Sequence, residues 1–384
     1  MPWRTGALRP ALLIAVALLL VACGGAATGP EADGAMEPGG TGSPSEPATP
    51  DDGEERAVAD RSETSELEGA DDDGEVVHLT VVATVAPVAD LVARVGGSRV
   101  AVDTLVPAGA DGHTYEPRPS DVLTLAGADA YLGIGLDLNP GVLRLAREHL
   151  PSTSPLVLLG ESALATADLI LDHAHSHGDD DHGHGHSHGD DDHGHSHDDG
   201  EFGPNPHVWT SLANTRALVA GIAEALTDLD PGGGASYATN AEVLIGELDA
   251  LDAEIRDAVA TIPAGNRTLV TYHDAWTYFA RDYGLVYATA VQPNDLSDPS
   301  ASEVRAIIDL VRELDVVALF GSEEFPTPVL ATIAEETGAR YLDGLSDDAL
   351  PGRPGDPEHR YVELMRRNAA IIVAGLGGDA SPLG

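Results

Sequence analysis

Histidines concentrate in one short stretch of the sequence, HAHSHGDDDHGHGHSHGDDDHGHSHDD, which runs from His173 to Asp199. Neutral imidazole is a common ligand for zinc, copper and nickel, and neighbouring carboxylates add negative charge and oxygen donors. The stretch contains no apolar side chain larger than alanine, so it cannot form a core of its own. We predict that it binds several transition-metal ions loosely, through His173, His175, His177, His182, His184, His186, His188, His193, His195 and His197.

Two alternatives to metal binding exist for this stretch. It could be a solvated acidic spacer or a purely compositional repeat. Neither accounts for a histidine at nearly every second position. The composition does not say whether the stretch is the main metal site or an accessory to one.

Three further histidines lie in segments that combine turn-forming residues with aromatic ones. They are His113 in GADGHTYEPRPSD, His207 in NPHVWTS and His273 in VTYHDAWTYFARDYGL. Each falls where a strand or loop meets a predicted helix, and their wide separation in the chain forms no local zinc-binding motif. The HExxH helix of metalloproteases is absent from the sequence, which weakens a hydrolase interpretation.

The composition limits the classes of partner. The chain has 384 residues and a formal net charge of −44, and arginine supplies all of its basic side chains other than histidine. Such acidity repels the phosphates of nucleic acids and attracts cations, so we expect no nucleic-acid partner. The single cysteine, Cys23, excludes an intrachain disulfide and a cysteine-rich zinc site.

The N-terminus, MPWRTGALRPALLIAVALLLVAC, places two arginines before an apolar run from Ala11 to Ala22. The run is shorter than the roughly 20 residues that cross a bilayer as a helix, and it has the proportions of a secretory signal. LVAC, Leu20 to Cys23, resembles a bacterial lipoprotein signal, in which the cysteine is lipidated and becomes the mature N-terminus. We therefore predict a signal peptide at residues 1–22 and a lipid anchor at Cys23. An ordinary signal peptide that contains a cysteine is the alternative.

Residues 23–75 form the predicted anchor and tether. After Cys23 this segment is rich in Gly, Pro, Ser, Asp and Glu and has almost no aliphatic residues. It cannot bury enough surface to offset the loss of chain entropy, so we predict a disordered acidic tether.

Strands alternate with helices over the rest of the chain, which predicts an α/β fold of two lobes. Apolar, β-branched runs at Val76–Val85, Val100–Pro107 and AYLGIG are predicted strands, and a helix capped by Ser120 is predicted between the last two. They form a first lobe with a mainly parallel sheet at residues 76–234, including a His/Asp-rich loop at residues 172–200. The pattern resumes in RTLVTYH, YGLVYATAV and DVVALFGS, which predicts a second such lobe at residues 263–384.

A long helix is predicted between the lobes, in segment 235–262. Apolar residues recur at helical spacing from Val243 to Val259, and Pro263 ends the run. A helix from Ala235 to Thr261 would be about 40 Å long at 1.5 Å per residue. That length suffices to brace two lobes, although periodicity alone also fits an ordinary surface helix.

Taken together, these segments resemble the metal-receptor lipoproteins of ABC importers, the zinc and manganese branch of the periplasmic solute-binding proteins. HTYEPRPSD, NPHVW, YHDAWTYFARDYGL and QPNDLSDPSASEVRAIIDLV are similar to that family's segments and occur in its order. The resemblance extends from Val76 to Leu376. It implies two α/β lobes joined by one rigid helix, metal in the cleft between them, and no catalytic activity. It also implies a monomer outside the cytoplasm, held at the membrane, with an ABC transporter permease as partner.

Carried over residue by residue, the resemblance makes His113, His207 and His273 metal ligands. The family's fourth ligand is often an aspartate near the C-terminus, and LSDDALPG offers Asp347 and Asp348. We prefer Asp348, because a small and then an apolar residue follow it. Three imidazoles and one carboxylate suit four-coordinate zinc, whereas oxygen-rich sites suit manganese, so Zn²⁺ is the expected transported ion.

Other residues near the motifs have secondary roles in this interpretation. Gly112 stands where the family commonly has proline, a departure that loosens the turn and leaves His113 in place. Glu116 and Asp274 are candidates for carboxylates that orient the imidazole rings. The histidines outside the motifs are interpreted as surface or structural residues: His78, His149 and His359.

Three other functions compete with a zinc receptor. One is a manganese-type receptor of the same family. Another is a secreted zinc hydrolase, which would leave a coordination position open for water and need a general base. The third is a metal buffer or adhesin in which the His-rich loop alone matters.

Overall fold

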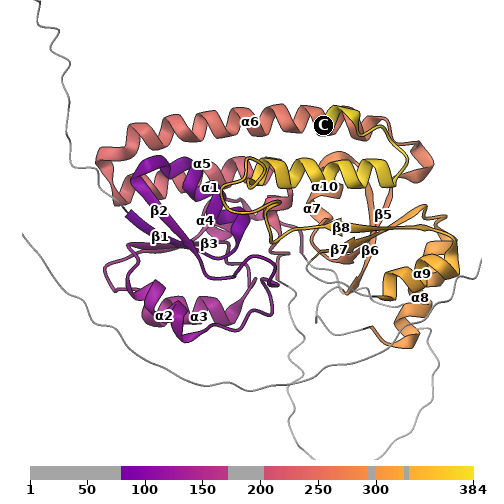
Figure 1. Ribbon diagram of the computed structural model, residues 1–384, viewed down its shortest axis with the longest axis horizontal. Helices are drawn as coiled ribbons and strands as arrows, with labels where there is room; N and C mark the ends of the chain where they lie inside the picture. Colours follow the sequence, from indigo (N-terminus) through magenta and orange to yellow (C-terminus); the bar gives the residue numbers. More distant parts are fainter. Residues whose placement is uncertain (1–78, 172–202, 293–298, 324–327) are drawn as a thin grey trace, which may run out of the picture. The chain divides into compact units, whose positions relative to one another are not determined.

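The computed structural model describes residues 79–171, 203–292, 299–323 and 328–384 (Figure 1). The predicted signal peptide, Cys23, the tether and the histidines of the His/Asp-rich loop lie outside the described residues, as does His78. Those assignments, and the boundaries drawn at residues 22 and 75, stay predictions.

The first lobe is built on a four-stranded parallel sheet (Figure 1). Its strands are β1 (Leu79–Ala83), β2 (Val100–Thr104), β3 (Ala130–Gly133) and β4 (Leu156–Leu158), in the order β2-β1-β3-β4. The central strands β1 and β3 are almost wholly buried, because helices cover both faces of the sheet, as parallel sheets require. These helices are α1 (Ala86–Gly96), α2 (Pro119–Ala126), α3 (Pro140–His149), α4 (Leu159–Ser162) and α5 (Leu212–Leu229).

The second lobe repeats this design. Its strands are β5 (Thr268–His273), β6 (Val286–Gln292), β7 (Ala318–Ser322) and β8 (Arg340–Leu345), all parallel and in the order β6-β5-β7-β8. Its helices are α7 (Thr277–Tyr283), α8 (Ala301–Glu313), α9 (Pro328–Thr337) and α10 (Tyr361–Gly375). Short 3₁₀ turns occur at Gly97–Arg99, Thr166–Asp168, Val208–Thr210, Pro231–Gly233, Ala264–Asn266 and Ser381–Leu383.

One helix of 27 residues, α6 (Gly234–Ala260), contacts both lobes (Figure 1). It packs against α1 and α5 of the first lobe and against α10 of the second. Its inward face carries Leu244, Leu248, Leu251 and Ile255, which are each at most 1% exposed. The helix begins one residue before the predicted start at Ala235 and ends one residue before Thr261. Within the described ranges, every helix is too short or too polar to span a bilayer.

Most of the buried apolar residues of the two lobes form one continuous cluster. It runs from Leu79 in β1 through α5 and α6 to Leu383. A second, smaller cluster lies within the second lobe, between strands β5 to β7 and helices α8 and α9, and includes Val270, Leu319 and Ile333. The lobes therefore share most of their interior.

The predicted cap of α2 is wrong. The helix begins at Pro119, so Ser120 lies inside its first turn and Arg118 is the N-cap. The side chain of Asp121 accepts a hydrogen bond from the backbone N–H of Arg118 at 2.6 Å. Proline favours the first helical position because it has no N–H to leave unsatisfied, and the helix therefore starts two residues earlier than a cap at Ser120 would place it.

Candidate metal centre

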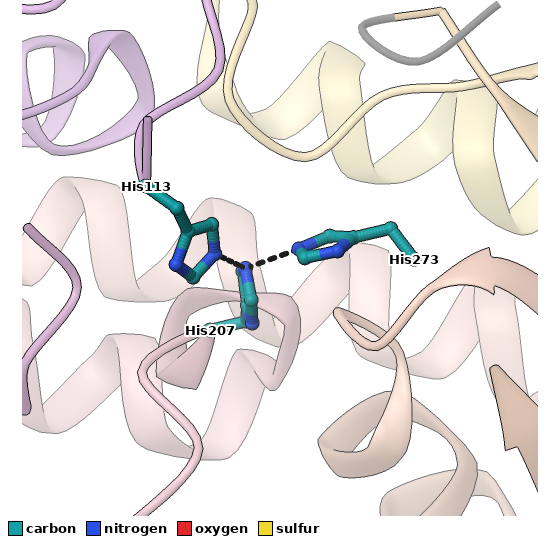
Figure 2. Close-up of side chains that lie close together, drawn as sticks. All are labelled: His113, His207 and His273. Atoms are coloured by element: carbon teal, nitrogen blue, oxygen red, sulfur yellow. Dashed lines mark hydrogen bonds between the residues drawn. The ribbon is translucent and has the colours of Figure 1, made fainter. Parts of the chain in front are cut away.

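His113, His207 and His273 come together where segments of the two lobes meet (Figure 2). The Nε2 atom of His207 lies 2.9 Å from Nε2 of His113 and 3.0 Å from Nε2 of His273. One nitrogen from each ring lies within 4.8 Å of the others. Tetrahedral coordination with bonds of 2.0–2.1 Å places ligand nitrogens roughly 3.3 Å apart. The three rings are therefore close enough to receive one metal ion, once the two short separations from His207 lengthen slightly and all three approach this value.

Each histidine is carried by a different kind of segment. His113 lies in the loop between β2 and α2, and His207 immediately precedes the 3₁₀ turn that leads into α5. His273 is the last residue of β5, at the carboxyl end of that strand. Ligands of open parallel sheets generally bind outside the carboxyl ends of the strands, so the position of the cluster follows from the sheet that carries His273.

An asparagine orients the central ring. The Oδ1 atom of Asn205 accepts a hydrogen bond from the backbone N–H of His207 at 3.0 Å and lies 2.9 Å from Nδ1 of the same residue. An amide oxygen at Nδ1 requires that nitrogen to carry the proton, so the lone pair of Nε2 faces the other two rings. The Nδ2 atom of Asn205 donates to the backbone oxygen of Asp274 at 2.8 Å.

Asn205 was not predicted from the sequence. Glu116 and Asp274 were the candidate orienting carboxylates, but Glu116 is exposed, and it is the backbone oxygen of Asp274 that Asn205 contacts. The available signal was the NPH tripeptide, in which a polar amide stands two residues before the histidine.

The two adjacent aspartates occupy different positions. Oδ2 of Asp347 lies 3.6 Å from Nε2 of His207, so this carboxylate faces the histidine cluster. Oδ2 of Asp348 instead accepts a hydrogen bond from the backbone N–H of Gly112 at 2.7 Å. The geometry therefore favours Asp347, and not the Asp348 preferred from the sequence, as the carboxylate beside the three rings.

The backbone of Asp347 is fixed from two sides. The indole Nε1 of Trp209 donates to the backbone oxygen of Asp347 at 2.8 Å. The side chain of Asn368 on α10 accepts from the N–H of Ser346 and donates to its oxygen, at 3.0 and 2.7 Å. Because Trp209 and Asn368 are at most 1% exposed, these contacts hold the loop rigidly beside the cluster.

Burial sets the protonation state of the three rings. The side chains of His207 and His273 are 1% and 3% exposed, whereas His113 is partly exposed. Burial lowers the pKa of His207 well below its usual value, and the neighbouring rings of His273 and His113 lower it further. Burial also lowers the pKa of His273 and, against the opposing charge of Asp111, that of His113. Neutral imidazoles have a free electron pair for a metal ion.

The family profile of ZnuA, zinc-uptake complex component A periplasmic, matches residues 81–375. The chain belongs to this family. Members of the ZnuA family are periplasmic solute-binding receptors of ABC metal importers, not enzymes. The predicted resemblance is therefore confirmed, and so is the absence of catalytic function, which removes the hydrolase alternative.

Individual relatives are named for different metals. The chain is 35% identical over 312 residues to the high-affinity zinc uptake system protein ZnuA of Paracoccus denitrificans, covering 78% of this chain and 92% of the relative. It is 27% identical over 308 residues to the manganese-binding lipoprotein MntA of Halalkalibacterium halodurans, covering 80% and 91%. The periplasmic description of the family agrees with the predicted location outside the cytoplasm.

The fold has a solved counterpart. The periplasmic zinc binding protein TroA of Treponema pallidum superposes with a TM-score of 0.65 at 25% identity, covering 78% of this chain and 99% of that protein. The predicted fold class, two parallel sheets flanked by helices, is confirmed.

Proposed function

We propose that the protein is a zinc receptor of an ABC importer, which captures one Zn²⁺ with His113, His207, His273 and Asp347. The observation that carries the proposal is the position of His207, whose Nε2 lies within 3.0 Å of the two other imidazoles and 3.6 Å from Asp347. Three neutral nitrogens and one carboxylate oxygen complete a tetrahedral set that leaves no position for a reacting water.

The choice of zinc over manganese rests on the donor atoms. The third ring, His273, supplies nitrogen at a position where a carboxylate would favour manganese. Nitrogen-rich sites suit zinc, and the Irving–Williams order also ranks zinc above manganese. The relative that binds zinc is 35% identical and the one that binds manganese is 27% identical, which supports the same choice.

The metal preference can be measured by thermal unfolding. At an ion concentration about 100 times the dissociation constant, binding stabilises the folded state by about 2.7 kcal/mol, which raises the melting temperature by about 5 °C or more. We expect this shift with Zn²⁺ and a much smaller one with Mn²⁺ at the same concentration. Equal or greater protection by Mn²⁺ would make the protein a manganese receptor instead.

The remaining parts of the chain fit delivery to a transporter. In this proposal residues 1–22 direct export, the lipid on Cys23 holds the receptor at the membrane surface, and segment 24–75 gives it reach. A monomeric receptor then presents the loaded ion to the permease. A lipid-labelling experiment on Cys23→Ala, which should abolish incorporation, checks the anchor.

The His/Asp-rich loop is proposed to collect metal for the main site. Flexible ligands must be ordered at each binding event, so their affinity is below that of a preformed site. Acidic residues between the histidines raise the local cation concentration. The loop ends shortly before His207 in the sequence, so ions held there are close to the histidine cluster.

Deleting residues 173–199 should therefore lower the total amount of bound zinc while leaving one tightly bound ion per chain. Equilibrium dialysis followed by elemental analysis measures both quantities in the intact and the deleted chain. If the deletion removed the tight ion and His113→Ala did not, the loop would be the main site and the proposed receptor site would be wrong.

A further inference from the structure

A buried hydrogen bond joins the loop that carries His113 to the second lobe. The backbone N–H of Gly112 donates to Oδ2 of Asp348 at 2.7 Å, across 236 residues of sequence. Gly112 is buried and Asp348 is 5% exposed. Hydrogen bonds with an ionised acceptor are stronger than neutral ones, and water weakens this one little because both partners are buried.

The His113 loop is otherwise tied to its own lobe. The Nδ2 atom of Asn139, the N-cap of α3, donates to the backbone oxygens of Gly112 and Tyr115 at 2.8 and 3.1 Å. The segment around His207 is fixed differently, because Asn205 and Thr210 donate to backbone oxygens at Asp274 and Ala275 in the second lobe. His207 and His273 are thus braced together, whereas His113 approaches them from the first lobe.

Glycine at position 112 permits the contact with Asp348. A Cβ atom there would lie 2.7 Å from Oδ2 of Asp348 and 3.3 Å from Cγ1 of Val85. Proline, which the family resemblance leads one to expect at this position, has no N–H to donate. The contact therefore depends on both residues. Gly112 supplies the N–H donor and leaves space for the carboxylate, and Asp348 supplies the charged acceptor.

We propose that Asp348 is a positioning residue that latches the His113 loop to the second lobe and sets the rate at which bound zinc leaves. The inference rests on the proposed zinc site. His113 is the ring closest to solvent, so release begins when its loop withdraws, and that movement breaks the bond between Gly112 and Asp348. Substitutions at one binding site mostly change dissociation rates and leave association rates similar.

The test uses the full chain loaded with one equivalent of Zn²⁺, and follows transfer of the ion to an excess of a coloured chelator. Loss of one charge-assisted hydrogen bond should accelerate the slow phase of release about 10-fold or more in Asp348→Ala and in Gly112→Pro. Asp348→Asn keeps an acceptor oxygen and should stay within about 3-fold of the natural chain. The double variant Gly112→Pro/Asp348→Ala should release zinc no faster than the faster single variant, because both changes remove the same bond.

The outcomes separate the latch from the zinc site itself. Tight binding of one Zn²⁺ that persists in all four variants, together with the accelerated release, supports the latch. Unchanged release in Asp348→Ala and Gly112→Pro overturns it, as does additive acceleration in the double variant. Complete loss of tight binding in Asp348→Ala, but not in Gly112→Pro, would make Asp348 a ligand.

If the natural chain itself held no zinc tightly, the proposed function would fail before the latch could be tested. Circular dichroism identifies a variant that does not fold. In that case Gly112→Ala, whose added Cβ would displace the carboxylate of Asp348, is measured in place of the unfolded variant.

Discussion

Replacing His207 by alanine should lower the affinity for zinc by more than about 100-fold. Removing a residue that only orients a metal ligand already lowers metal affinity by about 10- to 100-fold, and His207 is a proposed ligand itself. The central ring is the one whose Nε2 lies within hydrogen-bond distance of both other imidazoles. Its loss leaves two rings that no longer surround a common point. Competition against a chelator of known affinity measures the change.

His149→Ala is a matched control for this substitution. His149 ends α3 and is not among the three clustered histidines, so its removal should leave the affinity within about 3-fold, as for surface substitutions in general. Loss of tight binding in the His149 variant, or its retention in the His207 variant, would contradict the assignment of the site.

Replacing Asp347 by asparagine should lower the affinity for zinc by about 10- to 100-fold. The amide has nearly the same shape as the carboxylate but lacks its negative charge, and the bond from Trp209 to the backbone oxygen of Asp347 is unaffected. Isothermal titration gives the affinity and the stoichiometry together.

The neighbouring substitution Asp348→Asn separates the two aspartates. It should change the affinity by no more than about 3-fold, since an amide oxygen still accepts from Gly112. A larger loss in Asp348→Asn than in Asp347→Asn would restore the preference that the sequence suggested.

The central strands could be predicted because they are buried on both faces. Continuous apolar runs predicted β1, β3, β5 and β7, which lie inside their sheets, and also β2 and β6, which lie at one edge of each sheet. The edge strands β4 and β8 were not predicted. β4 has three half-buried residues, and RYLDGL in β8 contains polar side chains and a glycine, so neither has the apolar pattern of a strand enclosed by helices.

The order of the motifs identified the three histidines of the site. The sequence did not determine which of the two adjacent aspartates faces them. Which of the two faces the cluster depends on the backbone of the Ser346–Ala349 loop. That backbone is fixed by Trp209 and Asn368, which are distant from it in the chain. No local pattern around LSDDALPG contains this information.

The shared interior of the two lobes bears on how the chain unfolds. Since α6 contributes Leu244, Leu248 and Ile255 to a single apolar cluster that includes strands of both sheets, separating one lobe would expose the interior of the other. The described part of the chain should therefore lose its structure in one cooperative step, with no half-folded species that retains one sheet. A single captured ion then raises the free energy of opening for both lobes together. Loaded receptor would resist proteases along its whole folded length, so the cell would preferentially degrade the copies that have nothing to deliver.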